Sequence, residues 1–251
     1  MSPLSLLVAF KIFAMYIGTV RSFHVIILLL ATAHLHAQHF AYPSIIKSGN
    51  SIQDFIPQGW KILDVSRGDL TKDGKPDVAI VLQLKDSISF VKDLEDTVVT
   101  QPRMLLVLFK NKNNSRLVLA EKSTSFILNH DNAAMDDLFL GIAITKGVLN
   151  IKFRLFYNMG SWSVTNASYF FRYQQSMFQL IGADHFSFHR ASHEYESYSY
   201  NFLTKKRSLE KGKDEKRKGS VHWKILPPAA LKTFSSFPTP FSWEVEEGVV
   251  L

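Results

Sequence analysis

The chain has 251 residues, enough for one large domain or two small ones with a well-buried core. Apolar residues make up 46% and charged residues 20%, with 20 Phe, 8 Tyr and 4 Trp, which excludes a disordered chain, a coiled coil and a collagen-like repeat. The formal net charge is +7, and the lack of cysteine excludes disulfides, thiolate metal sites and a cysteine nucleophile.

The first 37 residues have the organisation of a secretory signal peptide. They contain two cations, Lys11 and Arg21, and no acidic residue, and an apolar run over residues 25–33 precedes small residues that end at Ala37. A positive start, a short apolar stretch and a small residue at the cleavage site are the shared features of such signals. We therefore predict a signal peptide over residues 1–37 and an exported protein, either periplasmic or extracellular.

A retained membrane anchor is the alternative for this terminus. Residues 4–20 are largely apolar, but they are only 17 in number and Lys11 interrupts them, which is marginal for crossing ~30 Å of hydrocarbon. Translation starts at Met1 or at Met15, since residues 15–37 alone form a signal of ordinary length. We expect membrane contact only through this N-terminal segment.

The positive charge is concentrated in one segment. Beyond residue 37 the chain carries 27 Lys and Arg against 22 Asp and Glu, and residues 205–218 alone hold eight cations and three acids. Nucleic-acid-binding surfaces interleave cations with aromatic side chains, which this segment lacks, so we expect no nucleic-acid partner. We predict a solvated hairpin tip with Gly212 and Gly219 at its bends; contact with anionic lipid or polysaccharide is the alternative.

Short runs of β-branched and aromatic residues, separated by turn residues, follow the leader. This pattern is typical of an all-β protein with antiparallel sheets, in a sandwich or a meander, and few short helices. We predict a single β domain over residues 38–251, with strands at residues 61–65, 78–84, 103–110, 116–121, 141–145, 148–157, 163–173, 177–182, 196–204 and 221–226. One short helix is expected over residues 131–140. Residues 227–251, with four prolines, are predicted to form an irregular tail packed by its aromatic side chains.

One motif points to a definite chemistry. Residues 68–77 read Gly-Asp-Leu-Thr-Lys-Asp-Gly-Lys-Pro-Asp and lead directly into a predicted strand. Alternate residues of a tight loop point inward, and the oxygens that they would supply suit Ca²⁺. We predict a structural Ca²⁺ site formed by Asp69, Thr71, Asp73, Asp77 and the carbonyl of Lys75. The alternative is an Asp-rich turn held by its own side-chain-to-backbone hydrogen bonds.

The run from Asp69 to Asp77 resembles the Asp-x-Asn-x-Asp-Gly-x-x-Asp calcium loops of FG-GAP and VCBS repeat proteins, the modules of integrin-alpha-like propellers. The family relies on many copies, so a single copy implies a calcium loop feeding a strand and not a propeller. Thr71 stands where the family has Asn or Asp, and its neutral hydroxyl is a weaker ligand.

A wider set of segments is similar to a group of uncharacterised secreted bacterial proteins. The segments are residues 55–63, the loop itself, and residues 171–173, 178–183 and 201–204. The His-Ala-Gln sequence at residues 36–38 is also similar to signal peptides of one group of Gram-negative bacteria. These resemblances imply a compartment and no particular activity.

Histidines and aromatic residues recur at regular spacing near the C-terminal half. His185, His189 and His193 would align on a helix as a Zn²⁺ site, but their neighbours favour strand and loop, where four residues span ~13 Å. We therefore predict separate histidines on the surface or partly buried. We expect core packing for two aromatic strips, Trp162/Tyr169/Phe171/Tyr173 and Tyr198/Tyr200/Phe202.

The sequence favours binding over catalysis. It contains no Gly-x-Ser-x-Gly, His-Glu-x-x-His or phosphate-loop motif. The acidic clusters Asp136–Asp137 and Glu244/Glu246/Glu247 are predicted to be solvated surface patches. We expect an exported β-rich binding or structural protein with a protein or polysaccharide partner. The alternatives are a cell-envelope hydrolase with an unrecognised carboxylate site, and an inhibitor or immunity protein that presents the basic hairpin to an acidic partner.

Overall fold

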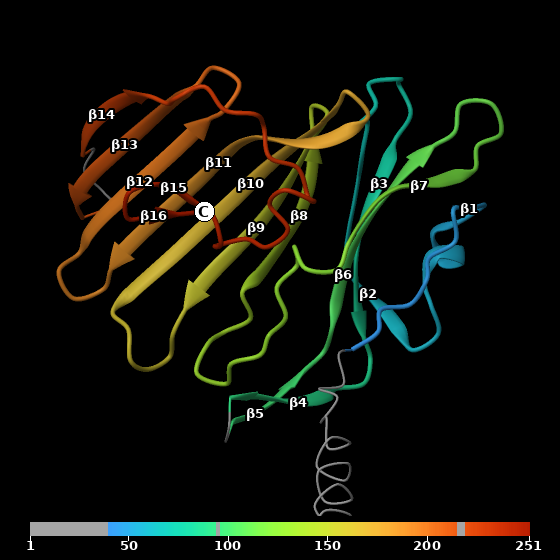
Figure 1. The fold of residues 1–251 in the computed structure, drawn as a ribbon, viewed down its shortest axis with the longest axis horizontal. Coiled ribbons are helices and arrows are strands. Elements are labelled where there is room, and N and C mark those ends of the chain that lie inside the picture. Colours follow the sequence, from blue (N-terminus) through green and yellow to red (C-terminus); the bar gives the residue numbers. More distant parts are fainter. Residues whose placement is uncertain (1–39, 94–95, 215–218) are drawn as a thin grey trace, which may run out of the picture. The chain divides into compact units, whose positions relative to one another are not determined.

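The computed structural model describes residues 40–93, 96–214 and 219–251 and shows an all-β protein (Figure 1). The chain up to Ala41 forms one unit, of which only Phe40 and Ala41 are described, and residues 42–251 form a second. The strand pairs of the second unit are antiparallel, which confirms the predicted fold class. The predicted signal peptide lies outside the described residues. Within them, no helix is long and apolar enough to cross a membrane.

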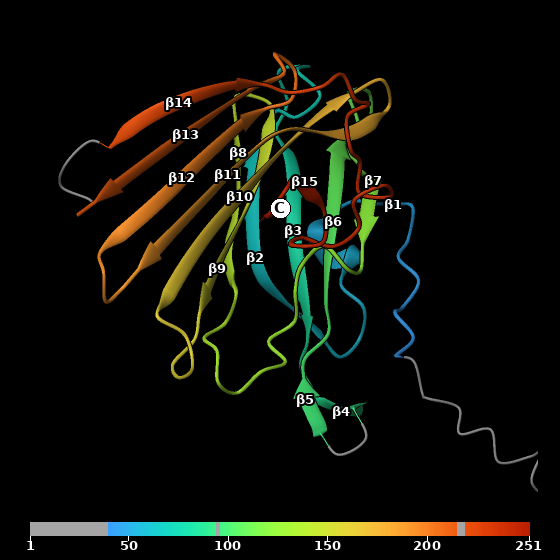
Figure 2. The ribbon, with the colours of Figure 1, turned by 60° about the vertical axis from the view of Figure 1, so that its left-hand side comes forward.

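The larger sheet is a seven-stranded meander, in which each strand pairs with the next one along the chain (Figures 1 and 2). Short turns join its strands; Lys146 and Gly147, for example, both take positive φ and form a two-residue hairpin turn. From one edge to the other the strands are β8 (Phe139–Thr145), β9 (Val148–Phe156), β10 (Ser163–Gln174), β11 (Met177–His189), β12 (Glu194–Asn201), β13 (Lys206–Lys213) and β14 (Ser220–Ile225).

The smaller sheet has five strands and is buried on both faces at its centre. Its spatial order is β1 (Ser48–Gly49), β7 (Leu117–Ser123), β6 (Arg103–Lys110), β3 (Asp77–Leu84) and β2 (Trp60–Gly68). The central strands β3 and β6 are almost continuously apolar, as strands covered on both faces must be. The segment 42–58, with the 3-10 helix η1 (Ile52–Phe55), covers the outward face, where Phe55 is fully buried.

The core lies between the inward faces of the two sheets and includes the C-terminal tail. At its centre the ring of Phe126 meets those of Phe153 and Tyr169 from the larger sheet and those of Phe234 and Phe237 from the tail. The ring centroids are 5.1–6.3 Å apart in edge-to-face arrangements. The tail also forms a small hairpin of β15 (Glu244–Glu246) and β16 (Val249–Val250). It is therefore part of the fold and not a loose extension.

The two sheets meet where β2 runs along the free edge of β8. Asp64 Oδ2 accepts a hydrogen bond from the Ile142 N–H at 2.8 Å, and Ser66 Oγ accepts one from the Ile144 N–H at 2.9 Å. Side chains of the smaller sheet thus accept hydrogen bonds from backbone N–H groups at the edge of the larger sheet. The approach is so close that a Cβ on Gly68 would lie 2.4 Å from the Ile144 side chain, which explains glycine at this position.

The predicted helix over residues 131–140 is wrong. The segment forms turns instead, and its last residues begin β8. Asn132 Oδ1 accepts a hydrogen bond from the Ala134 N–H, and Asp137 Oδ1 accepts one from the Phe139 N–H. These local acceptors compete with helical hydrogen bonds, which is why Asn and Asp favour turns over helix interiors.

The basic segment is also different from the prediction of a solvated hairpin tip, since most of it is strand β13. Alternate residues of this strand, Arg207 and Lys211, pair with Glu246 and Glu196, which are distant in sequence. A further hairpin that the sequence did not indicate, β4 (Ile88–Asp93) with β5 (Asp96–Thr100), is inserted between β3 and β6.

Candidate functional site

The carboxylate of Asp77 anchors the loop that was predicted to bind Ca²⁺. Asp77 is fully buried at the start of β3. Its Oδ2 accepts hydrogen bonds from the N–H groups of Leu70 and Thr71 at 2.9 and 3.0 Å and from the Thr71 hydroxyl at 3.2 Å. Its Oδ1 accepts a bond from the Lys110 N–H at 2.9 Å. Asp77 therefore ties the loop to β6.

The other two acids of the loop accept hydrogen bonds from its own backbone. Asp69 accepts bonds from the N–H groups of Gly74 at 2.8 Å and Asp73 at 3.0 Å, and these bonds, the one from Gly74 above all, lower the pKa of Asp69. Asp73 Oδ1 accepts a bond from the Lys75 N–H at 2.9 Å, while its Oδ2 lies 3.8 Å from Lys112 Nζ. Asp73 Oδ2 thus has the weakest attachment of these carboxylate oxygens.

The loop therefore has the hydrogen bonds of the alternative that the sequence left open, an Asp-rich turn. The carboxylate oxygens of Asp69 and Asp77 accept hydrogen bonds from backbone N–H groups, and the Thr71 hydroxyl donates to Asp77. Across residues 40–93, 96–214 and 219–251, no group of three or more His, Asp or Glu side chains is arranged to hold a metal ion. Calcium binding by the five predicted residues stays a prediction.

The three histidines do not converge. His185 and His189 lie on β11, and His193 lies in the following turn beside Asp214, with Nδ1 3.2 Å from the carboxylate. The His185 ring packs against Tyr198, and burial lowers the pKa of His185. The aromatic strips pack inward as expected, except for Trp162, which is 64% exposed.

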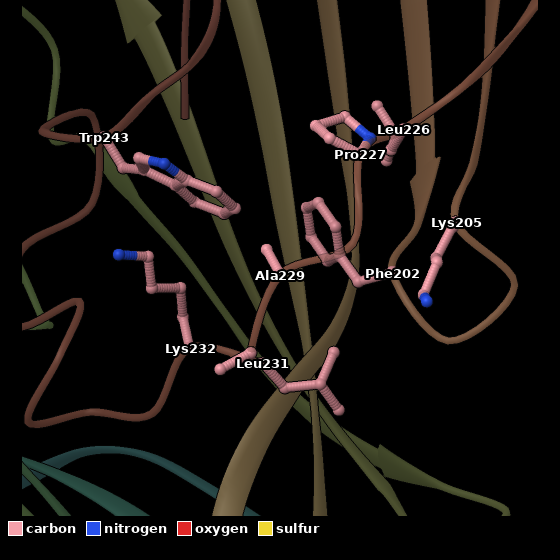
Figure 3. A pocket seen from close by; sticks show the side chains of 9 residues that line it. Phe202, Lys205, Leu226, Pro227, Ala229, Leu231, Lys232 and Trp243 are labelled. Atoms are coloured by element: carbon pink, nitrogen blue, oxygen red, sulfur yellow. The ribbon is translucent and has the colours of Figure 1, made fainter.

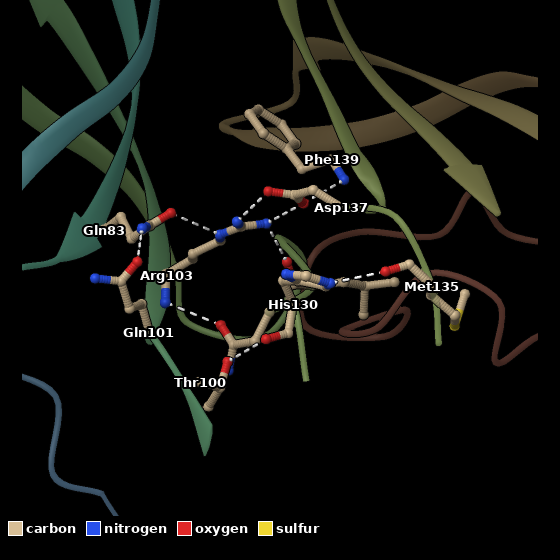
Figure 4. A network of polar contacts seen from close by, with 10 residues as sticks. Gln83, Thr100, Gln101, Arg103, His130, Met135, Asp137 and Phe139 are labelled. Atoms are coloured by element: carbon tan, nitrogen blue, oxygen red, sulfur yellow. Dashed lines mark hydrogen bonds and ion pairs between the residues drawn. The ribbon is translucent and has the colours of Figure 1, made fainter. Parts of the chain in front are cut away.

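A buried arginine organises the polar network drawn in Figure 4. Arg103 is almost fully buried at the start of β6. Its guanidinium donates to Gln83 Oε1 at 3.1 Å, to the Leu128 carbonyl at 2.9 Å and to both oxygens of Asp137 at 2.7 and 2.5 Å. Its backbone N–H donates to Asn129 Oδ1 at 3.0 Å. The network holds the long connection between β7 and β8 against the smaller sheet.

Asp137 lies at the surface, as the sequence suggested, with 44% of its side chain exposed, but it is paired with the buried Arg103. Burial raises the pKa of Asp137, but the hydrogen bonds and charge of Arg103 outweigh burial and bring it below its ordinary value. The guanidinium is committed to four acceptors, so we interpret this pair as structural and not as a substrate site.

A second ionic cluster fixes the tail under the other half of the larger sheet. Glu246 of β15 is only 10% exposed, and it accepts hydrogen bonds from Arg207 at 2.8 and 3.1 Å, from the Tyr200 hydroxyl at 3.0 Å and from Lys224. The hydrogen bond from Arg207 is the main cause that lowers the pKa of Glu246 to about 2. Glu246 is thus a clamp between the tail hairpin and strands β12 to β14.

A cavity beside this clamp is too small for a substrate. It lies between the β12–β13 turn and the tail, with Phe202, Leu226, Leu231 and Trp243 around it (Figure 3). Its volume of about 30 Å³ has room for a water molecule, whereas small-molecule sites occupy about 300–1,000 Å³.

Strand β14 is the most exposed apolar feature of the larger sheet. Val221, Trp223 and Ile225 share one face, and their exposed fractions are 50%, 71% and 78%. Among the described strands, β14 pairs only with β13, so its other edge is open (Figure 2). The sequence showed that these apolar residues alternate with polar ones, but it did not show that the apolar face would be exposed to solvent.

No protein-family model matches this chain, and neither a curated protein nor a solved structure matches it.

Proposed function

We propose that this chain is an exported binding protein that recruits an extended segment of a partner protein to the open edge of β14. The observation that carries this proposal is the exposure of Val221, Trp223 and Ile225 on an edge strand. Exposed edge strands with apolar side chains favour pairing with another strand, and proteins that avoid such pairing cover or charge their edges. Export rests on the predicted leader over residues 1–37.

The hydrogen-bond register of β14 supports this mode of binding. The Leu226 N–H donates to the Lys205 carbonyl at 2.8 Å, on the side of β13. Because bonding direction alternates along an antiparallel pair, residues 220, 222 and 224 also face β13. The N–H and C=O groups of Val221, Trp223 and Ile225 then point to the open side. A partner strand can satisfy these groups and pack its side chains on the exposed apolar ones.

The surrounding charge favours an acidic partner. Lys205 and Lys206 lie at one end of β14, and Lys211 and Lys213 lie near its other end, with Asp214 as the one acid among the described residues that follow Lys211 in this segment. Extended segments in which apolar residues alternate with Asp or Glu fit both the stripe and this charge. A polysaccharide could stack on Trp223, but it would leave the open backbone groups unused, so we favour a protein.

The test uses two labelled synthetic peptides, Glu-Val-Glu-Val-Glu-Val-Glu and its counterpart with Lys in place of Glu, with binding followed by fluorescence anisotropy. We expect the acidic peptide to bind at least tenfold more tightly. Val221→Pro removes an outward N–H without breaking the β13 pairing and should abolish binding. Trp223→Ser should weaken it, and Trp162→Ser, an exposed tryptophan away from β14, is the matched control.

Two outcomes would contradict strand addition. One is unchanged peptide binding by Val221→Pro while its melting temperature stays that of the wild type. The other is binding of soluble glucan oligosaccharides that depends on Trp223 but not on Val221→Pro, which would instead indicate sugar stacking.

A structural Ca²⁺ ion at residues 69–77 is part of the same proposal. Its role would be to stabilise the turn between β2 and β3 outside the cell, where Ca²⁺ is plentiful, and not to take part in chemistry. The hydrolase alternative has less support, because the best-connected carboxylates, Asp137 and Glu246, are each committed to an arginine.

A further inference from the structure

The outward face of the smaller sheet has one uncovered corner. The segment 42–58 covers most of this face, but it leaves a groove between the start of η1 and the ends of β2 and β6. The groove has a volume of about 460 Å³, within the range of small-molecule sites. Unlike the cavity beside the tail, it is open to solvent and large enough for a ligand.

The floor of the groove is apolar, and Ser51 and Gln53 lie on its η1 side. Val78 and Leu117 are buried in the floor, at 4% and 5% exposure, and Val65 lies beside them. Ile62 is 36% exposed along one side, and Pro76 closes the end next to the 69–77 loop. An apolar ligand can therefore remove already clustered side chains from water, which is the main source of binding energy for such sites.

Two cations border this apolar floor. Val78 on β3 pairs with Arg67 on β2 and with Leu108 on β6. Lys110 lies two residues after Leu108, so its side chain is on the same face. The two cations thus stand on strands separated by β3, about 10 Å apart across the sheet. Neither side chain forms a hydrogen bond or an ion pair with any residue that the structure describes.

We infer that this groove binds an amphipathic carboxylate, an alkyl chain with a single acidic head group. The alkyl chain would lie on Val65, Val78 and Leu117, and the carboxylate would pair with Arg67, which offers a two-pronged donor, or with Lys110. This site is on the other sheet from β14 and does not depend on the proposed strand addition.

The experiment is a calorimetric titration with octanoate, decanoate and dodecanoate, and with decanol as the uncharged probe. Each added pair of methylenes should strengthen binding, by up to about fourfold per buried methylene. Arg67→Gln and Lys110→Gln should each weaken dodecanoate binding by about tenfold and leave decanol binding unchanged. Lys61→Gln, an exposed cation on β2 outside the groove, is the matched control.

A variant that reverses the charge inside the groove gives an independent check. Ile62→Glu places a carboxylate beside the floor at a partly exposed position, so we expect a folded protein, by circular dichroism, that no longer binds dodecanoate. The inference is overturned if no saturable binding occurs, if binding is the same for all chain lengths, or if Lys61→Gln weakens binding as much as Arg67→Gln does.

Discussion

The two edges of the seven-stranded sheet differ in whether other groups of the protein contact them. At β8, Asp64 and Ser66 of the smaller sheet accept hydrogen bonds from the N–H groups of Ile142 and Ile144. At β14, no described strand covers the edge, and its apolar side chains, Trp223 among them, lie in solvent. The difference shows that this fold can close an edge with side chains alone, so the open edge is not a necessary consequence of the meander.

Buried charge distinguishes the two edges as well. The Arg103–Asp137 pair holds the connection that leads into β8, with the arginine side chain 4% exposed. The Glu246 clamp holds the tail against the inner face of β12 to β14, and it leaves the edge itself untouched. The first cluster anchors the connection that leads into the closed edge, whereas the second holds the tail behind the edge that no described strand covers.

The largest expected effect on the free energy of unfolding is at Arg103, which anchors the connection that leads into the closed edge. Arg103→Leu leaves Asp137, Gln83 and the Leu128 carbonyl without their donor. Water can hydrate Asp137, whose side chain is 44% exposed, so the loss comes mainly from the acceptors of Gln83 and Leu128, at about 1–3 kcal/mol for each one left unsatisfied. Urea unfolding should show this loss. Arg116→Leu, at an exposed position just before β7, should change the free energy of unfolding by less than about 0.5 kcal/mol. A loss below about 1 kcal/mol for Arg103→Leu would contradict the structural role.

Local patterns explain why much of the fold could be predicted. The unbroken apolar run at residues 103–110 indicated a central strand, and β6 has these bounds. Strand β13 could not be predicted in this way, because its mostly buried Arg207 is stabilised by Glu246 of the tail, and Lys211 is exposed. Glu246 is remote in sequence, so no local pattern contains it.

The next largest effect should appear behind the open edge, as a dependence on pH. The pKa of Glu246 is about 2 in the folded protein, below the ordinary value of 4.5, so its contribution is complete above pH 4.5 and is lost as the pH falls toward 2. Glu246→Gln should be less stable than the wild type at pH 7 by about 2 kcal/mol. The two unfolding free energies should converge between pH 4.5 and 2; a constant difference over this range would contradict the clamp.

A smaller effect is expected where side chains close the β8 edge. Asp64→Ala removes the acceptor of the Ile142 N–H, which should cost about 1–2 kcal/mol. Hydrogen exchange gives the sharper readout. The amide hydrogen of Ile142 should then exchange as fast as the outward-pointing amide hydrogens of Val221 and Trp223, which no described strand protects in the wild type. Asp64→Asn keeps an acceptor oxygen and is the control; protection of Ile142 that survives Asp64→Ala would show that the carboxylate does not close the edge.

The candidate binding sites were harder to predict than the strands. The alternation of Val221, Trp223 and Ile225 is visible in the sequence, yet only the strand order places β14 at an edge. The groove beside Arg67 likewise depends on the path of the 42–58 segment over the sheet. Both sites are surfaces that the described residues leave uncovered, which a local pattern does not predict.

The smallest effect on stability concerns the 69–77 loop. This loop lies next to the β8–β9 turn at the closed edge, where a Cβ added to Gly147 would lie 3.4 Å from the Asp69 carbonyl oxygen. A Ca²⁺ site with a dissociation constant of about 10⁻⁴–10⁻³ M would add about 0.4–1.4 kcal/mol at 1 mM Ca²⁺, or roughly 1–5 °C in melting temperature. Asp73→Ala should abolish this Ca²⁺-dependent increase. It should also lower the melting temperature in EDTA, because it removes the acceptor of the Lys75 N–H, so the readout is the difference between Ca²⁺ and EDTA.

Asp77→Asn separates the two explanations of the loop. Asp77 accepts four hydrogen bonds from protein donors, so this substitution should lower the melting temperature in EDTA as well as in Ca²⁺. If Asp77 is also a Ca²⁺ ligand, the loss should be larger in Ca²⁺; an equal loss indicates the turn alone. If EDTA leaves the wild type unchanged while Asp77→Asn is destabilised, the hydrogen-bonded turn alone explains the acidic motif. The closed edge would then be held by protein groups throughout, and the resemblance to calcium loops would reflect the demands of a tight turn before a buried strand.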